Sequence, residues 1–302
     1  MNKAPTFFVV GAPKSGTTSL YYYLRSHPQL YVPRRKELLY FCTDLTFRFP
    51  LLSKEQFLAY YDDMRAGQIA GEVSVWNLMS VDAPGRIYAE CPQARIIALL
   101  RHPADMLFSL FQNHVFNKNE ILTDFAEALD AEPHRRRGQM ISPVLRCPLQ
   151  ALWYSEIGRY ATQLRRYYNY FPRNQLLVIF FEDFISDTAA VYRSILTFLG
   201  VDPQYRPEFK IYNARKTVRS TLLRNLMVDA PKWLRQAARW ALPHHTRARD
   251  WLEQWLWKLN TRKVAAQQVP AALRARLIEQ YRQEIDDLAK LTGRDLSHWL
   301  IS

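Results

Sequence analysis

The sequence predicts an α/β fold: a P-loop-like parallel sheet flanked by helices, with a helical C-terminal extension. Apolar runs of strand length at residues 7–10, 94–100 and 175–181 alternate with helical patterns. This alternation is typical of a parallel sheet. A regular amphipathic pattern over residues 271–291 predicts the last helix.

The other elements are assigned in the same way. Residues 17–24 read as a helix after the first strand, and residues 68–72 as a short strand. Further helices are expected over residues 54–65, 83–91, 103–117, 153–171 and 191–199, the last stopped by Gly200. Extended segments are expected over residues 30–32 and 36–41, and an exposed insertion over residues 117–138 with the run Arg135-Arg136-Arg137.

A glycine-bearing loop joins the first strand to the first helix. Gly11 and Gly16 have the spacing of a Walker A box, but Thr17 occupies the position of its lysine, and the lysine lies earlier, at Lys14. Unpaired N–H groups at a helix N-terminus favour an anion. The next strong strand ends in Arg101 rather than in an acidic metal ligand. The loop therefore predicts a metal-free anion site at the carboxyl ends of the strands.

Three segments resemble motifs of the sulfotransferases that use 3′-phosphoadenosine 5′-phosphosulfate (PAPS). The 5′-phosphosulfate loop of that family is similar to Pro13-Lys14-Ser15-Gly16-Thr17-Thr18-Ser19-Leu20. Its 3′-phosphate motif resembles Arg101-His102-Pro103 followed by Ser109. A segment of its Golgi-type, heparan sulfate and bacterial carbohydrate branch resembles Arg35-Lys36-Glu37-Leu38-Leu39-Tyr40-Phe41. The resemblance implies a PAPS-dependent sulfotransferase whose PAPS site lies within residues 1–220.

The resemblance also implies roles for individual residues. In sulfuryl transfer, negative charge develops on the oxygen that bridges to the leaving 5′-phosphate, and a cation there stabilises it; Lys14 is expected in that role. Arg101 and Ser109 are expected to hold the 3′-phosphate, although Arg101 has an alternative as an ion-pair partner of Glu182 or Asp183. The other expected PAPS contacts are Ser15, Gly16, Thr17, Thr18, Ser19 and, in a late loop, Arg215, Lys216 and Arg219.

Glu37 is expected to be the general base that accepts the proton of the acceptor hydroxyl or amine. Its alternative is a rim carboxylate paired with Arg34, Arg35 or Lys36. The cytosolic small-molecule branch of the family has a histidine on the strand corresponding to residues 70–75. Glu72 stands on this strand instead and is expected as a second catalytic acidic group. Weaker base candidates are His27, His102 and His114.

The composition is basic, because Lys and Arg outnumber Asp and Glu by 41 to 28, for a formal charge of +13. Such a field concentrates anions without choosing among nucleotide, sulfated sugar, nucleic acid and anionic lipid. We expect a saccharide, a lipid-linked sugar or a hydroxylated metabolite as acceptor, with O- and N-sulfation both open, and neither a metal nor a nucleic acid. The alternatives are a P-loop nucleoside or nucleotide kinase, for which the Walker lysine is missing, and a basic nucleic-acid-binding protein, which only the charge suggests.

The location expected from the sequence is the cytoplasm, most simply of a bacterium. The 3 cysteines are widely spaced and indicate no disulfide framework. No signal-peptide pattern precedes the first strand. No apolar stretch approaches the ~18 residues that span a bilayer.

Residues 221–302 are expected to form a helical extension that packs on or caps the core of residues 1–220, within one structural domain. Residues 231–263 combine many Lys and Arg side chains with Trp233, Trp240, Trp251, Trp255 and Trp257. These helices are expected either to pack as a cap or to form a lid over the acceptor site that touches an anionic membrane surface. The sequence leaves both interpretations open.

Overall fold

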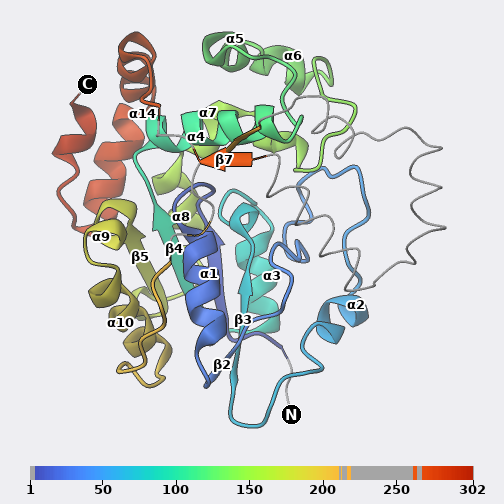
Figure 1. Cartoon of the computed structure of the whole chain (residues 1–302), viewed down its shortest axis with the longest axis vertical. Helices are drawn as coiled ribbons and strands as arrows, with labels where there is room; N and C mark the ends of the chain where they lie inside the picture. The colour runs from blue at the N-terminus through green and yellow to red at the C-terminus, as the bar shows by residue number, and fades with distance from the viewer. Residues whose placement is uncertain (1–3, 211, 213–215, 219–260, 264–266, 302) are drawn as a thin grey trace.

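The computed structural model of the chain describes residues 4–210, 212, 216–218, 261–263 and 267–301. In this part of the chain, five strands form one parallel sheet in the order β2-β3-β1-β4-β5 (Figure 1). The strands are β1 (Phe7–Gly11), β2 (Leu30–Tyr31), β3 (Ile69–Val73), β4 (Arg95–Leu100) and β5 (Leu176–Phe180). Helices flank this sheet, which confirms the α/β fold that the sequence predicts.

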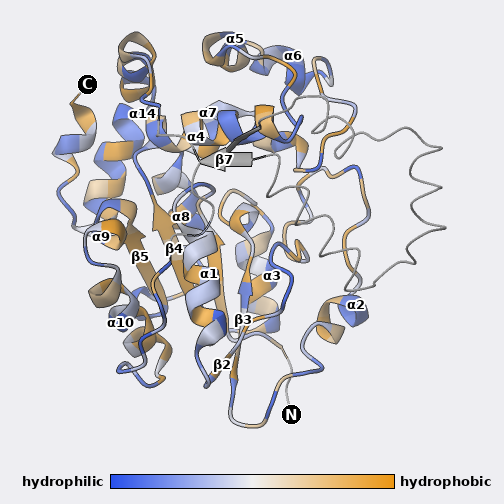
Figure 2. Ribbon diagram, in the orientation of Figure 1, coloured by the Kyte–Doolittle hydropathy of each residue, from blue (hydrophilic) through white to orange (hydrophobic). Residues whose placement is uncertain are grey.

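The central strands are apolar throughout because both faces of the sheet are covered. Phe7 and Val9 belong to one apolar layer, and Phe8 and Val10 to the other. The first layer contains side chains of α1 (Thr17–Ser26), α9 (Phe181–Ser186) and α10 (Thr188–Leu199). The second contains side chains of α3 (Ala83–Glu90), α4 (Pro103–Phe116), α8 (Tyr160–Tyr168) and α14 (Ala271–Thr292). Figure 2 shows β4 and β5 as apolar ribbons between helices of mixed polarity.

Local signals fix the ends of several helices. Pro103 begins α4, and the Nδ1 atom of His102 accepts a hydrogen bond from the backbone N–H of Ala104 at 3.2 Å. The Asp187 carboxylate caps α10 by accepting a bond from Ala190 N at 2.9 Å. Gly200 ends the same helix with φ 70°, a conformation that favours glycine. The stop predicted at Gly200 is confirmed.

The predicted last helix is present as α14, which packs on α4 and α8. Arg274 Nη1 contacts Asp105 Oδ1 of α4 at 2.8 Å, and Arg165 Nη2 of α8 contacts Asp287 Oδ2 at 3.0 Å. Beyond α14, the buried Trp299 of η4 (Ser297–Leu300) donates from Nε1 to Glu182 Oε1 at 3.0 Å. These contacts hold the C-terminal residues against α4, α8 and α9.

A two-stranded antiparallel ladder joins β6 (Lys216–Val218) to β7 (Thr261–Lys263). The tryptophan-rich interval 231–263 lies, apart from residues 261–263, outside the described residues. The cap, the lid and the boundary near residue 220 therefore stay predictions. No helix in the described ranges is both long enough and apolar enough to cross a membrane.

The helix predicted over residues 153–171 is divided into α7 (Tyr154–Ile157) and α8. The break falls at Gly158, which lies against Tyr281 of α14: a Cβ at Gly158 would be 2.7 Å from the tyrosine ring. The single long helix was therefore a wrong prediction, because the close approach of α14 determines the chain path there. The predicted helix over residues 54–65 is also shorter, as α2 (Lys54–Ala59).

The exposed insertion predicted over residues 117–138 is wrong as well. This region contains α5 (Phe125–Asp130), which packs on α4, and α6 (Glu132–Arg136), which lies beside η2 (Leu149–Leu152). Arg135 is fully buried and forms a two-pronged ion pair with Glu120, with N···O distances of 2.8 and 2.7 Å. A buried arginine needs such a partner, and this one lies fifteen residues away in the sequence.

The segment 36–41 was predicted to be extended, and this too is wrong. Glu37 and Leu39 adopt φ values of 59° and 62°, so the backbone turns twice in the left-handed region. Leu38, Leu39 and Phe41 are buried below the turn. We call residues 36–39 the Glu37 turn.

Candidate functional site

The phosphate loop, residues 12–16, leaves β1 and ends at the N-terminus of α1. Lys14 and Gly16 have φ values of 57° and 88°. At Gly16 a Cβ would also lie 3.1 Å from the Phe184 ring, so glycine serves both the conformation and the packing. The loop therefore turns tightly above the end of β1 and presents the first N–H groups of α1.

The hydroxyl groups of the phosphate loop and of the first turn of α1 differ in the hydrogen bonds that they already make. Ser15 is fully buried and donates to Pro13 O at 3.2 Å. Ser19 Oγ accepts a bond from Tyr212 N at 3.2 Å. Thr17 is buried in the first turn of α1, and Thr18, beside it, receives a bond from the Lys36 ammonium at 3.2 Å. The Ser15 hydroxyl thus bonds within the phosphate loop, and the Ser19 hydroxyl bonds to the backbone of Tyr212. The Thr18 hydroxyl is bonded to Lys36 of the Glu37 turn.

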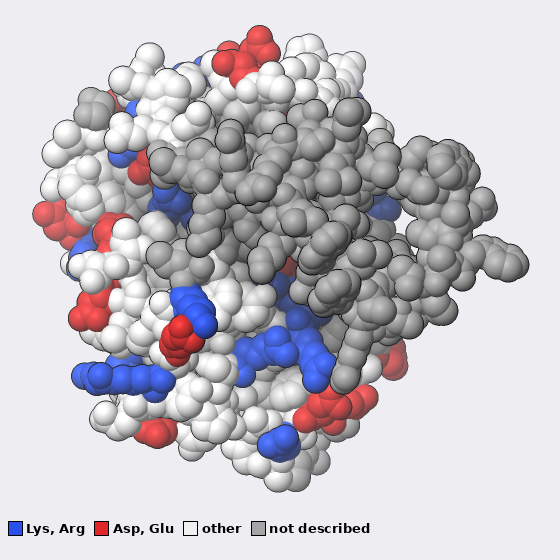
Figure 3. All heavy atoms as spheres, in the orientation of Figure 1, with Lys and Arg blue, Asp and Glu red and all other residues white. Residues whose placement is uncertain are grey.

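Three cations converge on this loop. Burial, Arg101 and Lys36, in that order, lower the pKa of Lys14 to about 8. Arg101 follows β4, donates from Nη1 to Lys14 O at 3.2 Å, and stacks 4.8 Å from the centre of the Phe181 ring. Mutually repelling cations in a partly buried place favour a bound anion. Figure 3 shows Lys and Arg side chains gathered over α1 and the loop after β2.

Lys36 was not among the residues predicted for the site. It contacts both Thr18 of α1 and Glu37 of the turn, and it is one of the causes of the lowered Lys14 pKa. The signals for it in the sequence were its place in the motif of residues 35–41 and its position as a possible ion-pair partner of Glu37. Its direction depends on the left-handed backbone of Glu37, which the residue types do not indicate.

The carboxylate of Glu37 is held on both oxygens. Glu37 Oε1 lies 3.1 Å from Lys36 Nζ, and Oε2 accepts a bond from Val75 N at 3.0 Å. The backbone N–H of Glu37 donates to Val73 O at the end of β3, at 2.9 Å. Glu37 is thus both at the anion site and paired with Lys36. The pairing with Lys36, one of the alternatives that the sequence left open, is thus present, and the role of Glu37 as general base stays a prediction.

Glu72 lies beneath the Glu37 turn rather than on the surface of the site. Its side chain is buried with 1% exposure and accepts bonds from Ser74 Oγ and from Asn77 Nδ2, the latter at 3.1 Å. Burial raises its pKa to about 8, and the nearby Glu37 carboxylate adds to the shift. Ser74 Oγ also accepts a bond from Leu39 N at 3.4 Å. Glu72 is therefore placed to support the turn that presents Glu37.

The expected 3′-phosphate residues lie on adjoining parts of the structure. Arg101 follows the carboxyl end of β4, and Ser109 lies two turns into α4, half-buried. The alternative partners of Arg101 are engaged elsewhere: Glu182 Oε1 binds Trp299 Nε1 at 3.0 Å, and Asp183 Oδ1 binds Arg294 Nη2 at 2.8 Å.

The residues just before the late loop, Lys210 and Tyr212, contact α1. Tyr212 stacks on Tyr22 with ring centres 4.1 Å apart, and Tyr23 OH donates to Lys210 O at 2.7 Å. Arg215 and Arg219 lie outside the described residues, and Lys216 is described only by its backbone in β6. Their contacts to a nucleotide stay predictions.

The three histidines that the sequence offered as weaker bases are buried, and two of them lie within hydrogen-bond distance of backbone carbonyl groups. His27 Nε2 lies 3.1 Å from Asp202 O, and His102 Nε2 lies 2.9 Å from Trp299 O. His114 is buried in α4, and burial lowers the pKa of its imidazole to about 3. Within the described residues, no group of three His, Cys, Asp or Glu side chains is arranged to hold a metal.

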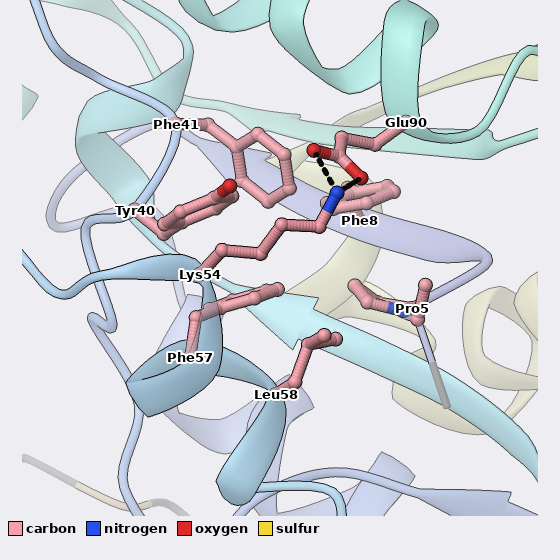
Figure 4. A pocket seen from close by; sticks show the side chains of 9 residues that line it. Pro5, Phe8, Tyr40, Phe41, Lys54, Phe57, Leu58 and Glu90 are labelled. Atoms are coloured by element: carbon pink, nitrogen blue, oxygen red, sulfur yellow. Dashed lines mark hydrogen bonds and ion pairs between the residues drawn. The ribbon is translucent and has the colours of Figure 1, made fainter. Parts of the chain in front are cut away.

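A small apolar pocket is lined by side chains of β1, α2 and Tyr40 and Phe41, which follow the Glu37 turn (Figure 4). Tyr40 and Phe57 stack there with ring centres 4.5 Å apart. The ion pair of Lys54 with Glu90, at 2.8 Å, spans its mouth. The free volume of about 10 Å³ is about that of one water probe, so this pocket is too small to accept a substrate.

The chain is similar to known sulfotransferases over much of its length. Residues 4–216, which include the phosphate loop, the Glu37 turn and Arg101, match the sulfotransferase domain. The crystal structure of a sulfotransferase from Alicyclobacillus acidocaldarius superposes with a TM-score of 0.73 at 27% identity over 98% of both chains. Human bifunctional heparan sulfate N-deacetylase/N-sulfotransferase 3 is 28% identical over 210 residues, 68% of this chain and 23% of that protein.

A shorter match is to the membrane-associated sulfotransferase kil1 of Dictyostelium discoideum. It is 32% identical over 110 residues, which are 36% of this chain and 22% of that protein. The chain therefore spans less than a quarter of the length of these curated relatives. The family match covers residues 4–216 and so includes the phosphate loop. It confirms the resemblance to sulfotransferases that the sequence motifs indicate. The chain belongs to the sulfotransferase domain family.

Proposed function

We propose that this sulfotransferase takes its sulfuryl group from PAPS and transfers it to a hydroxyl or amine of an acceptor. The observation that carries the proposal is the convergence of Lys14, Lys36 and Arg101 at the N-terminus of α1, beside the Glu37 carboxylate. Such a site binds an anion and has a carboxylate in place to accept a proton.

The residues present fit the anionic groups of PAPS. Lys14, Thr17, Thr18 and the N–H groups of the loop would hold the 5′-phosphosulfate. Arg101 and Ser109 would hold the 3′-phosphate. The lowered pKa of Lys14 supports this fit, because a bound anion would offset the repulsion among the cations.

PAPS, when bound, supplies a sulfuryl group joined to its 5′-phosphate. The acceptor oxygen or nitrogen forms a bond to sulfur, while the bond between sulfur and the bridging oxygen breaks and leaves its electron pair on the phosphate. Lys14 stabilises the charge on that oxygen. Glu37 takes the proton that the acceptor loses. Glu72, which was expected to be catalytic, supports the Glu37 turn from below.

Two observations bear on the class of acceptor. Heparan sulfate appears in the names of several relatives. The exposed Arg25, Arg34 and Arg35 lie on α1 and the loop after β2, where they suit a polar acceptor that carries negative charge. We propose a saccharide or a lipid-linked sugar as acceptor and a cytoplasmic enzyme, with residues 231–263 in contact with the membrane surface.

Isothermal titration calorimetry tests the donor. Adenosine 3′,5′-bisphosphate should bind much more tightly than AMP, with no change in EDTA, because Arg101 and Ser109 contact only the 3′-phosphate and no metal takes part. Glu37→Gln should lower turnover by ~10²–10⁴-fold while nucleotide binding is retained. Equal affinities for the two nucleotides would contradict the assignment of the 3′-phosphate site.

A further inference from the structure

Lys36 is the one described side chain that bonds both to the helix of the anion site and to Glu37. Its Nζ atom lies 3.2 Å from Thr18 Oγ1 and 3.1 Å from Glu37 Oε1. The two members of the ion pair are partly open to solvent: the Lys36 side chain is 24% exposed and the Glu37 side chain 27%. Because neither side chain is fully buried, the ammonium has room to shift from Glu37 towards α1.

We propose that Lys36 is a positioning residue that couples donor binding to the release of Glu37. This inference rests on the proposed function, in which the anion binds at the N-terminus of α1. Before the donor binds, Lys36 covers Oε1 of Glu37, the oxygen that Val75 N–H leaves free. An anion beside Thr18 offers the ammonium a second negative partner and draws it towards α1. Oε1 is then open to accept the proton of the acceptor.

The geometry of the turn makes this exchange feasible. The Glu37 carboxylate does not depend on Lys36 for its position, because Val75 N–H holds Oε2 at 3.0 Å and the backbone N–H of Glu37 is bonded to Val73 O. Departure of the ammonium therefore frees one oxygen while the other stays fixed. Glu37 would then be free to accept the acceptor proton only while the donor is bound.

The alternative is that Lys36 is a fixed tether between α1 and the turn. The two ideas differ in how Lys36 and Glu37 affect anion binding. If the ammonium stays in place, the two side chains act on a bound anion independently, and their substitutions combine additively. If the ammonium moves, removal of the Glu37 charge releases it to the anion, and the two substitutions are coupled.

A double-mutant cycle measures this coupling without any reaction. We would titrate adenosine 3′,5′-bisphosphate into the wild type, Glu37→Gln, Lys36→Met and the double variant. Glu37→Gln should strengthen binding about fivefold in the presence of Lys36 and less than about twofold in the Lys36→Met background. Adenosine 3′-monophosphate, which lacks the 5′-phosphate, should show no such difference. Arg35→Met is the matched control: it removes a neighbouring charge bonded to Tyr60 and should leave the effect of Glu37→Gln intact.

Equal effects of Glu37→Gln in the two backgrounds would overturn the inference and leave the proposed function standing. A wild type that does not prefer the bisphosphate over AMP would overturn both. If Lys36→Met does not fold, Lys36→Gln takes its place, since it keeps a donor for Thr18 Oγ1 but no charge. Thermal unfolding of each variant confirms that the affinities refer to folded protein.

Discussion

The buried Glu72 makes the stability of the fold depend on pH in an unusual direction. Burial raises its pKa from 4.5 to about 8, so the folded protein keeps the carboxyl protonated at pH 7, whereas the unfolded chain ionises it. The unfolded state then binds fewer protons, and the free energy of unfolding falls as pH rises. The stabilising contribution is complete below pH 4.5 and is lost as pH rises to about 8. These two pKa values correspond to a loss of about 2–3 kcal/mol between pH 5 and pH 7.

Glu72→Gln isolates this effect, because an amide keeps the shape, accepts from Asn77 Nδ2 and donates to Ser74 Oγ without ionising. Urea unfolding at pH 5, 6 and 7 should show the free energy of unfolding of the variant rising by about 2–3 kcal/mol relative to the wild type across this range. Glu127→Gln, at an exposed position of α5, serves as control and should show a constant difference. A difference between Glu72→Gln and wild type that does not change with pH would refute the protonated state assigned to Glu72.

Three further predictions follow from single contacts. Arg101→Ala should weaken adenosine 3′,5′-bisphosphate by about 1.5–3 kcal/mol, the range for a hydrogen bond to a charged group, and calorimetry with AMP should show a much smaller loss. Because the pKa of Lys14 is about 8, bisphosphate affinity should fall about tenfold between pH 7 and pH 9 as the free ammonium loses its proton; Lys14→Arg, if it binds, should remove that dependence. Trp299→Ala should destabilise the fold by about 3–5 kcal/mol in urea unfolding, since the buried indole packs on Phe180 and bonds to Glu182.

The sheet could be predicted from the sequence because both of its faces are covered. Continuous apolar runs leave few alternatives to buried strands, and β4 and β5 lie within one or two residues of the predicted ranges. Helix ends with Pro103 or Gly200 were also readable, since these residues act locally. The break at Gly158 and the burial of Arg135 were not, because they depend on Tyr281 and Glu120, which contact these residues only in the folded chain.

The site was predictable in its residue types more than in its geometry. The glycine spacing and the positions of Lys14 and Arg101 after strands indicated an anion site, and the structure brings these two residues into contact. Glu72 was predicted from its place at the end of a short strand, where the small-molecule branch of the family has a histidine, but no local pattern showed that it would be buried. The direction of Glu37 depends on a left-handed backbone at a residue that rarely adopts it. Hydrogen bonds to Val73 and Val75 hold that conformation.

The lysine of the phosphate loop is displaced relative to a Walker A box, and further cations lie beside it. In a Walker A box the lysine follows the second glycine, whereas here Thr17 takes that position and is buried in α1. Lys14 reaches the site from within the loop, where burial and Arg101 lower its pKa and so reduce its hold on a proton. Lys36 approaches from the opposite side through Thr18. The cationic charge is thus divided between the loop and the turn that also carries Glu37. In the proposed mechanism, binding an anion and freeing the base would therefore involve the same side chain, Lys36.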